Sequence, residues 1–334
     1  MRVSAVLRFV PRTQFPEYNV PLAAFASHHR KALADLRDLA SQIDYVLELR
    51  DSRAPLSTIN PLIGQALPGV PRITLYTKRD LSRVNASKVA PLHPDGHFRV
   101  ISTEEPKYAR QLLKDFKVQF NAQTLKPPLG YKILIAGMPN AGKSTLINML
   151  RKVVFGKNAK KVAATAPTPG KTRATSEQIL VSKDPKVYVV DTPGVLLPKV
   201  QDWEHMLKLA LIGAVPTNLI DPIVLADYLL YHINLTYPAG GKYPGPQSND
   251  IMEVLWSLAH KQRRKPSRET WDPNQTAIVW IQRYISGEIC TLCLDDMSPN
   301  NVERCIETMA MQRHDLNSLL PAANLRKRPR SWRF

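Results

Sequence analysis

The residues from Gly137 to Thr145 (Gly-Met-Pro-Asn-Ala-Gly-Lys-Ser-Thr) match the phosphate-binding pattern G-x-x-x-x-G-K-[ST]. The apolar stretch 131–136 before them predicts a strand, and residues 146–150 after them continue as a helix. In this setting, glycines let backbone N–H groups converge on phosphate oxygens at a helix N-terminus. Lys143 would neutralise charge on the β- and γ-phosphates, and the Ser144 hydroxyl would ligate Mg²⁺. We therefore expect a nucleoside triphosphate to be bound by Pro139, Asn140, Ala141, Gly142, Lys143, Ser144 and Thr145.

A second motif for the phosphate side, Asp191-Thr192-Pro193-Gly194, follows the predicted buried strand 187–190. In phosphate-loop NTPases such an aspartate holds Mg²⁺ through water, and the glycine N–H faces the γ-phosphate. Between the two motifs lies a loop with several threonines, 165–173, from which one hydroxyl should reach the metal. Thr172 is the expected ligand and Thr168 the alternative. The predicted metal ligands are therefore Ser144, Thr172 and Asp191, and the predicted catalytic residues include Lys143 and Gly194.

These motifs fit an ATPase or a small-molecule kinase as well as a GTPase. The identity of the nucleotide base therefore needs separate evidence. Guanine recognition requires a carboxylate that accepts the N1–H and the exocyclic amine, and a lysine packed over the ring. Lys78 and Asp80 supply both groups in Leu-Tyr-Thr-Lys-Arg-Asp (75–80), directly after an apolar run. Thr77 opens this base loop. Ser102 and Thr103, after the predicted strand 98–101, are placed to contact the guanine O6 through the backbone.

The order of these elements is unusual, because the base loop precedes the phosphate loop instead of following it. The base loop, the Ser102 loop, the phosphate loop, the threonine loop and the Asp191 motif follow one another along the chain. This rotated order indicates a circular permutation of a GTPase domain. The permutation leads from the switch at 191–194 directly into the C-terminal part of the chain, so loss of the γ-phosphate is able to reorient that part.

The hydrophobic pattern predicts an α/β fold with a largely parallel sheet, because short apolar strands alternate with helical segments. Strands are predicted at 45–49, 73–76, 98–101, 131–136 and 187–190, and a helix at 27–40 has Leu33, Leu36 and Ala40 on one face. Functional loops are expected at the carboxyl ends of such strands. After residue 198 helices are predicted at 204–214, 221–231, 249–260 and 300–320.

The predicted organisation therefore has three parts. Residues 1–24 form an N-terminal segment, and 25–198 form a circularly permuted phosphate-loop GTPase domain with a doubly wound, mainly parallel sheet. Residues 199–334 form a smaller, mainly helical and basic domain.

Charge is the unusual feature of the composition. The chain has 334 residues, a formal net charge of +18 and a pI near 9.9, which favours a polyanionic partner, either nucleic acid or an anionic membrane surface. Basic clusters in the predicted helical domain, taken with this net charge, favour RNA phosphate binding over an ordinary solvated surface. The predicted RNA-binding residues are Lys261, Arg263, Arg264, Lys265, Arg326, Lys327, Arg328 and Arg330.

The remaining sequence signals concern the compartment. Only three cysteines occur, so we expect no disulfide framework and a reducing interior. Cys290 and Cys293 have a metal-like spacing, but without a second pair the preferred interpretation is buried cysteines in a strand at 288–294. The arginine-containing apolar start has no acidic residue before Glu17 and predicts a mitochondrial targeting segment, with an untargeted basic N-terminus as the alternative. No uninterrupted apolar run is long enough to span a bilayer.

These motifs together make the chain resemble the circularly permuted YlqF/RbgA-type GTPases, and most closely their mitochondrial branch, the mitochondrial ribosome-associated GTPase 1 proteins. The resemblance rests on residues 25–32, 51–57 with 60–61, 77–80, 137–145 and 191–199, and extends more weakly through 209–214. It implies GTP hydrolysis coupled to late assembly of the mitochondrial large ribosomal subunit in the matrix, with rRNA as the main surface contacted. The expected cofactors are GTP or GDP and Mg²⁺. We expect a monomer that binds no DNA, and leave open a peripheral contact with the inner membrane.

The chain departs from the pattern of this family in its base loop and its N-terminal motif. The family's base loop usually begins with Asn where Thr77 stands, which implies weaker nucleotide binding with guanine selectivity kept by Asp80. Ser27-His28-His29 replaces Gly-His-Met, so the resemblance aligns His28 with the histidine proposed to assist hydrolysis, and a contact to rRNA phosphate is the alternative role. Hydrolysis needs such a group because Val195 stands where Ras-like enzymes carry a water-orienting Gln. The rival functions are a permuted GTPase for the small subunit or for a cytosolic or nucleolar particle, and a nucleotide-gated RNA-binding module with negligible turnover.

Overall fold

A six-stranded sheet with the order β3-β2-β1-β4-β6-β5 forms the centre of the larger part of the molecule. The computed structural model describes residues 9–22, 27–156, 178–197, 200, 202–261 and 271–316, and of 27, 28, 30 and 309–316 it describes the backbone alone. The strands are β1 (Tyr45–Asp51), β2 (Arg72–Thr77), β3 (Phe98–Val100), β4 (Tyr131–Gly137), β5 (Gln178–Lys183) and β6 (Lys186–Asp191). Neighbouring strands run parallel except β5, which pairs antiparallel with β6 at one edge. The predicted α/β fold with a mainly parallel sheet is confirmed.

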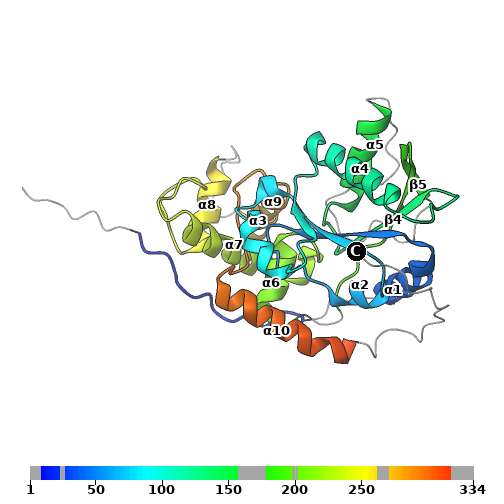
Figure 1. Ribbon diagram of the computed structural model, residues 1–334. Helices are drawn as coiled ribbons and strands as arrows, with labels where there is room; N and C mark the ends of the chain where they lie inside the picture. Colours follow the sequence, from blue (N-terminus) through cyan, green and yellow to red (C-terminus); the bar gives the residue numbers. More distant parts are fainter. Residues whose placement is uncertain are drawn as a thin grey trace, which may run out of the picture.

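Helices cover both faces of this sheet (Figure 1). Successive side chains of a strand point to opposite faces, so Leu47 of β1 joins the core beneath α4 and α5, while Val46 joins the core beneath α1 and α2. Leu33 and Leu36 of α1 are buried there, as their helical spacing predicted. The helices of this part are α1 (Ser27–Leu39), α2 (Pro61–Ala66), α3 (Ala86–Val89), α4 (Pro106–Asn121) and α5 (Lys143–Phe155), with short 3₁₀ turns η1 (Ala40–Gln42), η2 (Arg79–Leu81) and η3 (Ala90–Leu92).

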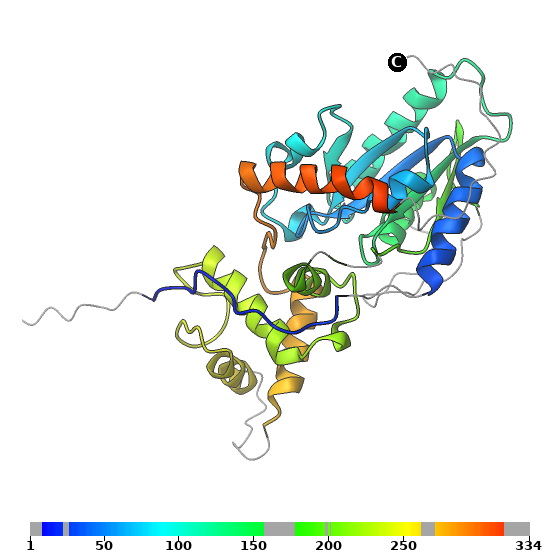
Figure 2. The ribbon, with the colours of Figure 1, turned by 90° about the horizontal axis from the view of Figure 1, so that it is seen from below.

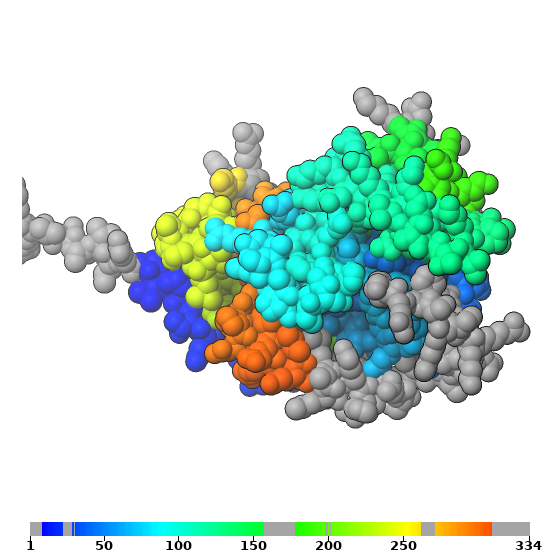
Figure 3. All heavy atoms as spheres, viewed as in Figure 1, coloured from blue at the N-terminus to red at the C-terminus, as the bar shows by residue number. Residues whose placement is uncertain are grey.

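The C-terminal part of the chain is helical and has a core of its own. Its elements are α6 (Trp203–Leu211), η4 (Thr217–Leu219), α7 (Pro222–Thr236), α8 (Ile251–Lys261), α9 (Pro273–Ile285) and α10 (Pro299–Leu316). α7 lies at the centre of this core, where Leu225, Tyr228 and Leu229 are fully buried beside Trp280 of α9. α10 leaves this group and packs against α2 and η3 of the sheet-containing part, beside which it lies in the space-filling view (Figure 3).

The described part of the N-terminal segment, residues 9–22, runs across these C-terminal helices (Figure 2). The Arg12 guanidinium contacts both carboxylate oxygens of Asp227 on α7, at 2.5 and 3.0 Å. Phe15 packs edge-on against Tyr228 with ring centroids 5.0 Å apart. The predicted boundaries near residues 24 and 198, and the targeting role of the first residues, stay predictions.

The structure differs from the sequence predictions in several elements. Neither β5 nor α9 was predicted: β5 is a half-exposed edge strand without a clean alternation, and α9 begins with a proline that was not recognised as a helix start. The strand predicted at 288–294 is wrong, since these residues form an extended loop whose Leu292 and Leu294 are buried in the helical core. In the part of the chain that the structure describes, no helix is both long and apolar enough to cross a membrane.

Candidate nucleotide site

The predicted nucleotide loops meet at one edge of the sheet. Asp51, Thr77, Gly137 and Asp191 are the last residues of β1, β2, β4 and β6, and these strands run parallel. Because parallel strands end at the same edge, loops that are far apart in the sequence come together there.

The phosphate loop connects β4 to α5 with the backbone geometry that anion binding requires. Gly142 precedes the helix with φ 86°, in the left-handed region that glycine adopts without strain. The buried Lys143 side chain turns back into the loop, where its Nζ donates to Met138 O at 2.8 Å and to Gly137 O at 3.2 Å. Burial lowers the pKa of Lys143 to about 8, although nearby Asp191 opposes this shift. A bound phosphate would supply the anionic partner that this ammonium group needs.

The predicted Mg²⁺ ligands Ser144 and Asp191 lie together beside the phosphate loop. The Ser144 hydroxyl donates to the Asp191 carboxylate at 3.4 Å. Burial raises the pKa of Asp191, while Lys143 and this hydrogen bond lower it. A hydroxyl and a carboxylate are hard oxygen ligands of the kind that Mg²⁺ prefers, so this donor set fits the metal. Thr172, the third predicted ligand, and its alternative Thr168 lie outside the described residues.

The switch loop after β6 packs directly against the phosphate loop. A Cβ added to Gly194 would lie 2.5 Å from the backbone nitrogen of Pro139, so only glycine permits this approach. The next residue, Val195, donates its N–H to Gly137 O at 3.2 Å, and its carbonyl accepts from the Asn60 side chain at 2.9 Å. The Val195 side chain is only 1% exposed. Neither its chemistry nor its burial suits it to orient an attacking water.

The predicted base loop lies beside the phosphate loop, and Thr77 joins the two. The buried Thr77 hydroxyl lies 2.8 Å from Ala141 O in the phosphate loop and 3.1 Å from Arg50 O at the end of β1. Lys78 follows with φ 56°, and the exposed Asp80 lies in the short turn η2. This turn leaves the Asp80 carboxylate accessible to a base.

The Ser102 loop after β3 lies next to the base loop, as predicted. The backbone N–H of Arg79 donates to Ile101 O at 3.1 Å, which ties the two loops together. Ser102 and Thr103 are both buried, and Thr103 lies 3.6 Å from the position that a Cβ would take on Gly142. The structure therefore brings Thr77, Lys78, Asp80, Ser102 and Thr103 together with the phosphate loop, Ser144, Asp191 and Gly194.

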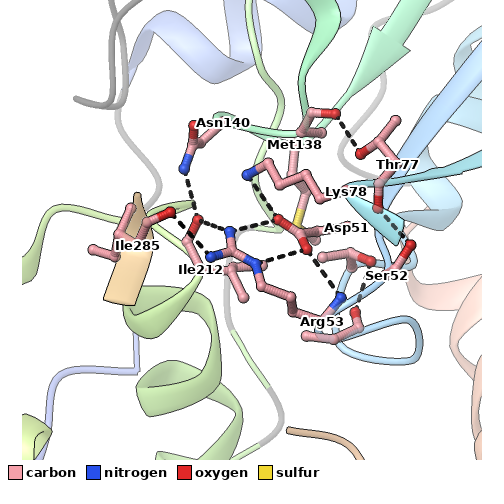
Figure 4. Close-up of polar contacts among 12 residues, drawn as sticks. Asp51, Ser52, Arg53, Thr77, Lys78, Met138, Asn140, Ile212 and Ile285 are labelled. Atoms are coloured by element: carbon pink, nitrogen blue, oxygen red, sulfur yellow. Dashed lines mark hydrogen bonds and ion pairs between the residues drawn. The ribbon is translucent and has the colours of Figure 1, made fainter. Parts of the chain in front are cut away.

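Sequence reasoning assigned no role to Asp51 and Arg53, which form the buried side of the base loop. The Lys78 ammonium lies 2.8 Å from Asp51 Oδ2, and Arg53 contacts both oxygens of the same carboxylate (Figure 4). Burial lowers the pKa of Lys78 to about 8, against the effect of Asp51. The Arg53 and Lys78 cations hold the pKa of Asp51 well below its usual range despite its burial. The sequence feature that could have pointed to these two residues is the charged sequence Asp-Ser-Arg at the end of an apolar strand.

Two histidines, His28 and His29, lie in the first turn of α1, and the structure describes the side chain of His29. His29 is buried, and its Nδ1 lies 3.1 Å from the carbonyl oxygen of Gly194 in the switch loop. His29 was not among the predicted site residues. His28, the predicted catalytic histidine, has a side chain outside what the structure describes. The described contact to the switch loop is therefore made by His29, and the catalytic role of His28 stays a prediction.

Lys261 is the predicted RNA-binding residue that the structure describes. It is exposed at the end of α8 and lines a hollow of about 380 Å³ together with Lys242 and Arg283. Arg283 forms a 3.0 Å ion pair with Glu288, whereas Lys242 lies 4.5 Å from the Tyr237 ring centroid. The other predicted residues, Arg263, Arg264, Lys265, Arg326, Lys327, Arg328 and Arg330, lie outside the described residues.

The predicted pair Cys290 and Cys293 lies in the loop after α9. Cys290 is buried and Cys293 is partly so, and burial raises the pKa of each thiol to about 12. Among the described residues, no group of three or more His, Cys, Asp or Glu side chains is arranged to hold a metal ion.

Known proteins with similar sequences are GTPases. Residues 132–254 match the family model described as "50S ribosome-binding GTPase". "Mitochondrial GTPase 1" of Saccharomyces cerevisiae is 39% identical over 312 residues, which cover 84% of this chain and 83% of that protein. "Mitochondrial ribosome-associated GTPase 1" of Ictalurus punctatus is 31% identical over 294 residues, covering 81% of this chain and 91% of that protein.

A solved structure shares the fold. The GNP-bound structure of YlqF from T. maritima superposes with a TM-score of 0.54 at 20% identity, covering 80% of this chain and 99% of that chain. Since the yeast and fish proteins share more than 30% identity over most of both chains, this chain belongs to the mitochondrial GTPase 1 family.

Proposed function

We propose that this GTPase binds the mitochondrial large ribosomal subunit through its rRNA in the matrix and couples GTP hydrolysis to late assembly of that subunit. The relatives named for mitochondrial ribosome association, and the matching model of 50S ribosome-binding GTPases, support the choice of particle. The net charge of +18 supports an RNA surface as the partner.

The observation that carries the proposal is the contact between the nucleotide loops and the C-terminal helices. Gly194 packs on Pro139, and only residues 195–202 separate this switch from α6. On the other side, Asn140 of the phosphate loop donates its side-chain N–H to Ile212 O at the end of α6, at 2.7 Å. A conformational change at the γ-phosphate can therefore reach the basic helical part through few intervening residues.

In this proposal the site residues take the roles that their positions suit. Lys143 neutralises the β- and γ-phosphates, Ser144 and Asp191 with Thr172 hold Mg²⁺, and the Gly194 N–H faces the γ-phosphate. The metal, when bound, screens the charge that develops between the phosphates. Asp80 receives the guanine N1–H and amine.

The hollow lined by Lys242, Lys261 and Arg283 is the described surface that we assign to RNA phosphates, with Glu288 also at its wall. Its cations lie on α8, α9 and the loop before α8. Binding through such cations weakens as salt is raised, because the release of counterions from the RNA on binding becomes less favourable.

Single-turnover GTP hydrolysis with purified mitochondrial subunits tests the proposal. We expect stimulation by large subunits and none by small subunits, and Lys143→Met serves as the inactive control. Stimulation by the small subunit alone would move the proposal to that particle.

The second candidate is a nucleotide-gated RNA-binding module with negligible turnover, which the buried Val195 favours because it cannot orient water. Nucleotide-dependent binding to the large subunit without any stimulated hydrolysis would select this module.

A further inference from the structure

The Arg53 side chain lies completely inside the molecule, between the base loop and the C-terminal helices (Figure 4). Its Nε and Nη2 donate to the two carboxylate oxygens of Asp51 at 3.0 and 2.8 Å. Its Nη1 donates to Ile285 O, the last residue of α9, at 3.2 Å, and Nη2 also donates to Ile212 O, directly after α6, at 3.1 Å. One side chain thus joins β1 to the C-terminal ends of two helices of the other part.

Charge balance explains why the helix ends are part of this group. The buried Asp51 carboxylate faces two cations, Arg53 and Lys78, so the three side chains together carry one excess positive charge. A helix C-terminus carries about half an elementary negative charge on its unpaired carbonyl groups. The ends of α6 and α9 therefore supply negative charge that offsets part of this excess. The Tyr284 ring, with its centroid 5.8 Å from the Arg53 guanidinium carbon, adds a polarisable face.

Asp51 is shared between the helices and the base loop. Lys78, the lysine predicted to cover the guanine ring, reaches Asp51 Oδ2 at 2.8 Å, and Arg53 Nη2 reaches the same oxygen. A base that displaces or fixes the Lys78 ammonium changes how much of the Asp51 charge remains for Arg53. Because the group is buried, such a change is poorly screened.

We propose that Asp51 and Arg53 are positioning residues that couple the guanine pocket to the docking of α6 and α9. Lys78 transmits base occupancy to Asp51, and Arg53 transmits it to the carbonyl groups at the two helix ends. The proposal rests on the assignment of the base loop within the proposed function. It does not depend on the identity of the ribosomal particle, so a failed ribosome experiment would leave it standing.

A second contact also links the nucleotide site to the end of α6, so the experiment must distinguish it from the contact through Arg53. Ile212 O also accepts from Asn140 of the phosphate loop at 2.7 Å. Ligands that fill different parts of the site distinguish the routes. GDP fills both the phosphate loop and the base pocket, whereas pyrophosphate fills the phosphate loop alone.

Hydrogen exchange of the full-length protein provides the test. We expect saturating GDP to slow amide exchange at residues 209–214 and 283–288 by about fivefold or more, which is a typical coupling between two sites. Saturating pyrophosphate should slow exchange at the phosphate loop and leave these two segments unchanged. Equal protection by both ligands would assign the coupling to Asn140, and no protection by GDP in the wild type would also overturn the proposal.

Arg53→Lys is the variant that separates coupling from simple support of the fold. It keeps the charge, but an ammonium group cannot form the planar fork that contacts Asp51 and both carbonyls. We expect it to lose the difference between GDP-bound and free exchange at the two segments and to bind GDP about fivefold or more weakly. A purely structural Arg53 would speed exchange in both states and preserve their difference.

Arg99→Lys is the control, because Arg99 of β3 pairs with Asp115 of α4 at 2.8 Å, within the sheet-containing part. It should retain the GDP-dependent protection. If Arg53→Lys does not fold, the wild-type comparison of GDP with pyrophosphate still decides the proposal.

Discussion

His29 Nδ1 lies 3.1 Å from the carbonyl oxygen of Gly194, so the first turn of α1 contacts the switch loop of the nucleotide site. Both partners are largely enclosed, since His29 is only 3% exposed and Gly194 packs against Pro139. The contact gives α1 a direct influence on the backbone that is predicted to face the γ-phosphate.

Replacement of His29 by phenylalanine should therefore lower stimulated hydrolysis while leaving nucleotide affinity nearly unchanged. Phenylalanine keeps a planar ring but has no N–H donor, and loss of one such hydrogen bond costs about 1 kcal/mol, or about fivefold in rate if it is made in the transition state. The measurement is single-turnover hydrolysis with large subunits, together with GDP binding. An unchanged stimulated rate would restrict His29 to packing.

His28→Ala is the companion variant, because the family resemblance assigns to His28 the role of assisting hydrolysis. We expect a stimulated rate about 100-fold or more below that of the wild type, which is the usual contribution of a group that assists proton transfer. Intrinsic hydrolysis without ribosomal subunits serves as the reference. Equal stimulated rates in the variant and the wild type would remove His28 from catalysis and favour its alternative role at rRNA phosphate.

Thr77→Val should weaken GDP binding about fivefold, because the variant removes the hydroxyl that lies 2.8 Å from Ala141 O and leaves that buried carbonyl unpaired. Thr77→Ser keeps the hydroxyl and should bind GDP like the wild type. Thr77→Asn, the residue usual in the family, tests the earlier expectation of weaker affinity. Fluorescent-nucleotide titration of the three variants compares them directly, and equal affinity of the valine and serine variants would show that the hydroxyl is dispensable.

The strands and the nucleotide loops were predictable because their signals are local. A largely continuous apolar strand that runs into Gly137–Ser144 or Asp191–Gly194 is recognised from a short window of sequence. The parallel pairing then places every such loop at one edge of the sheet. Nothing more than the order of the motifs was needed to recognise the permutation.

The contacts between the two parts were not predictable, because they depend on side chains far apart in the sequence. Arg53 donates to Ile285 O, and Asp295 accepts from the backbone of Leu56 and from Ser57. No periodic pattern of residues in the sequence predicts hydrogen bonds between such distant positions. The loop at 288–294 was misassigned for a related reason: its alternating apolar residues fill the helical core without any strand partner.

Nucleotide affinity should fall as the pH rises above about 8, the pKa to which burial lowers Lys143. The nucleotide-free protein then carries a largely neutral Lys143, whereas bound phosphates raise its pKa and require the charged form. Below pH 8 the lysine is already protonated and affinity is constant. Above pH 8 binding takes up a proton, and affinity falls by up to about tenfold for each pH unit.

GDP titrations between pH 7 and 9.5 measure this slope, and calorimetry in buffers of different ionisation enthalpy counts the proton. Lys143→Arg is the control, because a guanidinium remains charged throughout this range. A wild-type slope that persists in the arginine variant would assign the titration to another group, such as Lys78, whose pKa is also lowered to about 8.

The segment 9–22 should stabilise the helical part, since its side chains complete an aromatic core and an ion pair. Phe15 packs against Tyr228 and Tyr231 with centroid distances of 5.0 and 5.6 Å. Because Phe15 is only partly buried, Phe15→Ala should cost about 1–3 kcal/mol of unfolding free energy. Arg12→Met removes the partner of the largely buried Asp227 and should also destabilise the protein, by about 1–3 kcal/mol.

Denaturant unfolding monitored by tryptophan fluorescence compares these variants with Val10→Ala, a control whose side chain is 73% exposed. The control should unfold like the wild type. The same contacts bear on the predicted targeting segment, because a mature protein that lost residues 9–22 would expose the faces of α7 that Arg12 and Phe15 cover. We therefore expect a protein truncated before Phe9 to be as stable as the full chain, and one truncated after Leu22 to unfold at clearly lower denaturant concentration. Equal stability of both truncated proteins would mean that the segment contributes nothing to the fold.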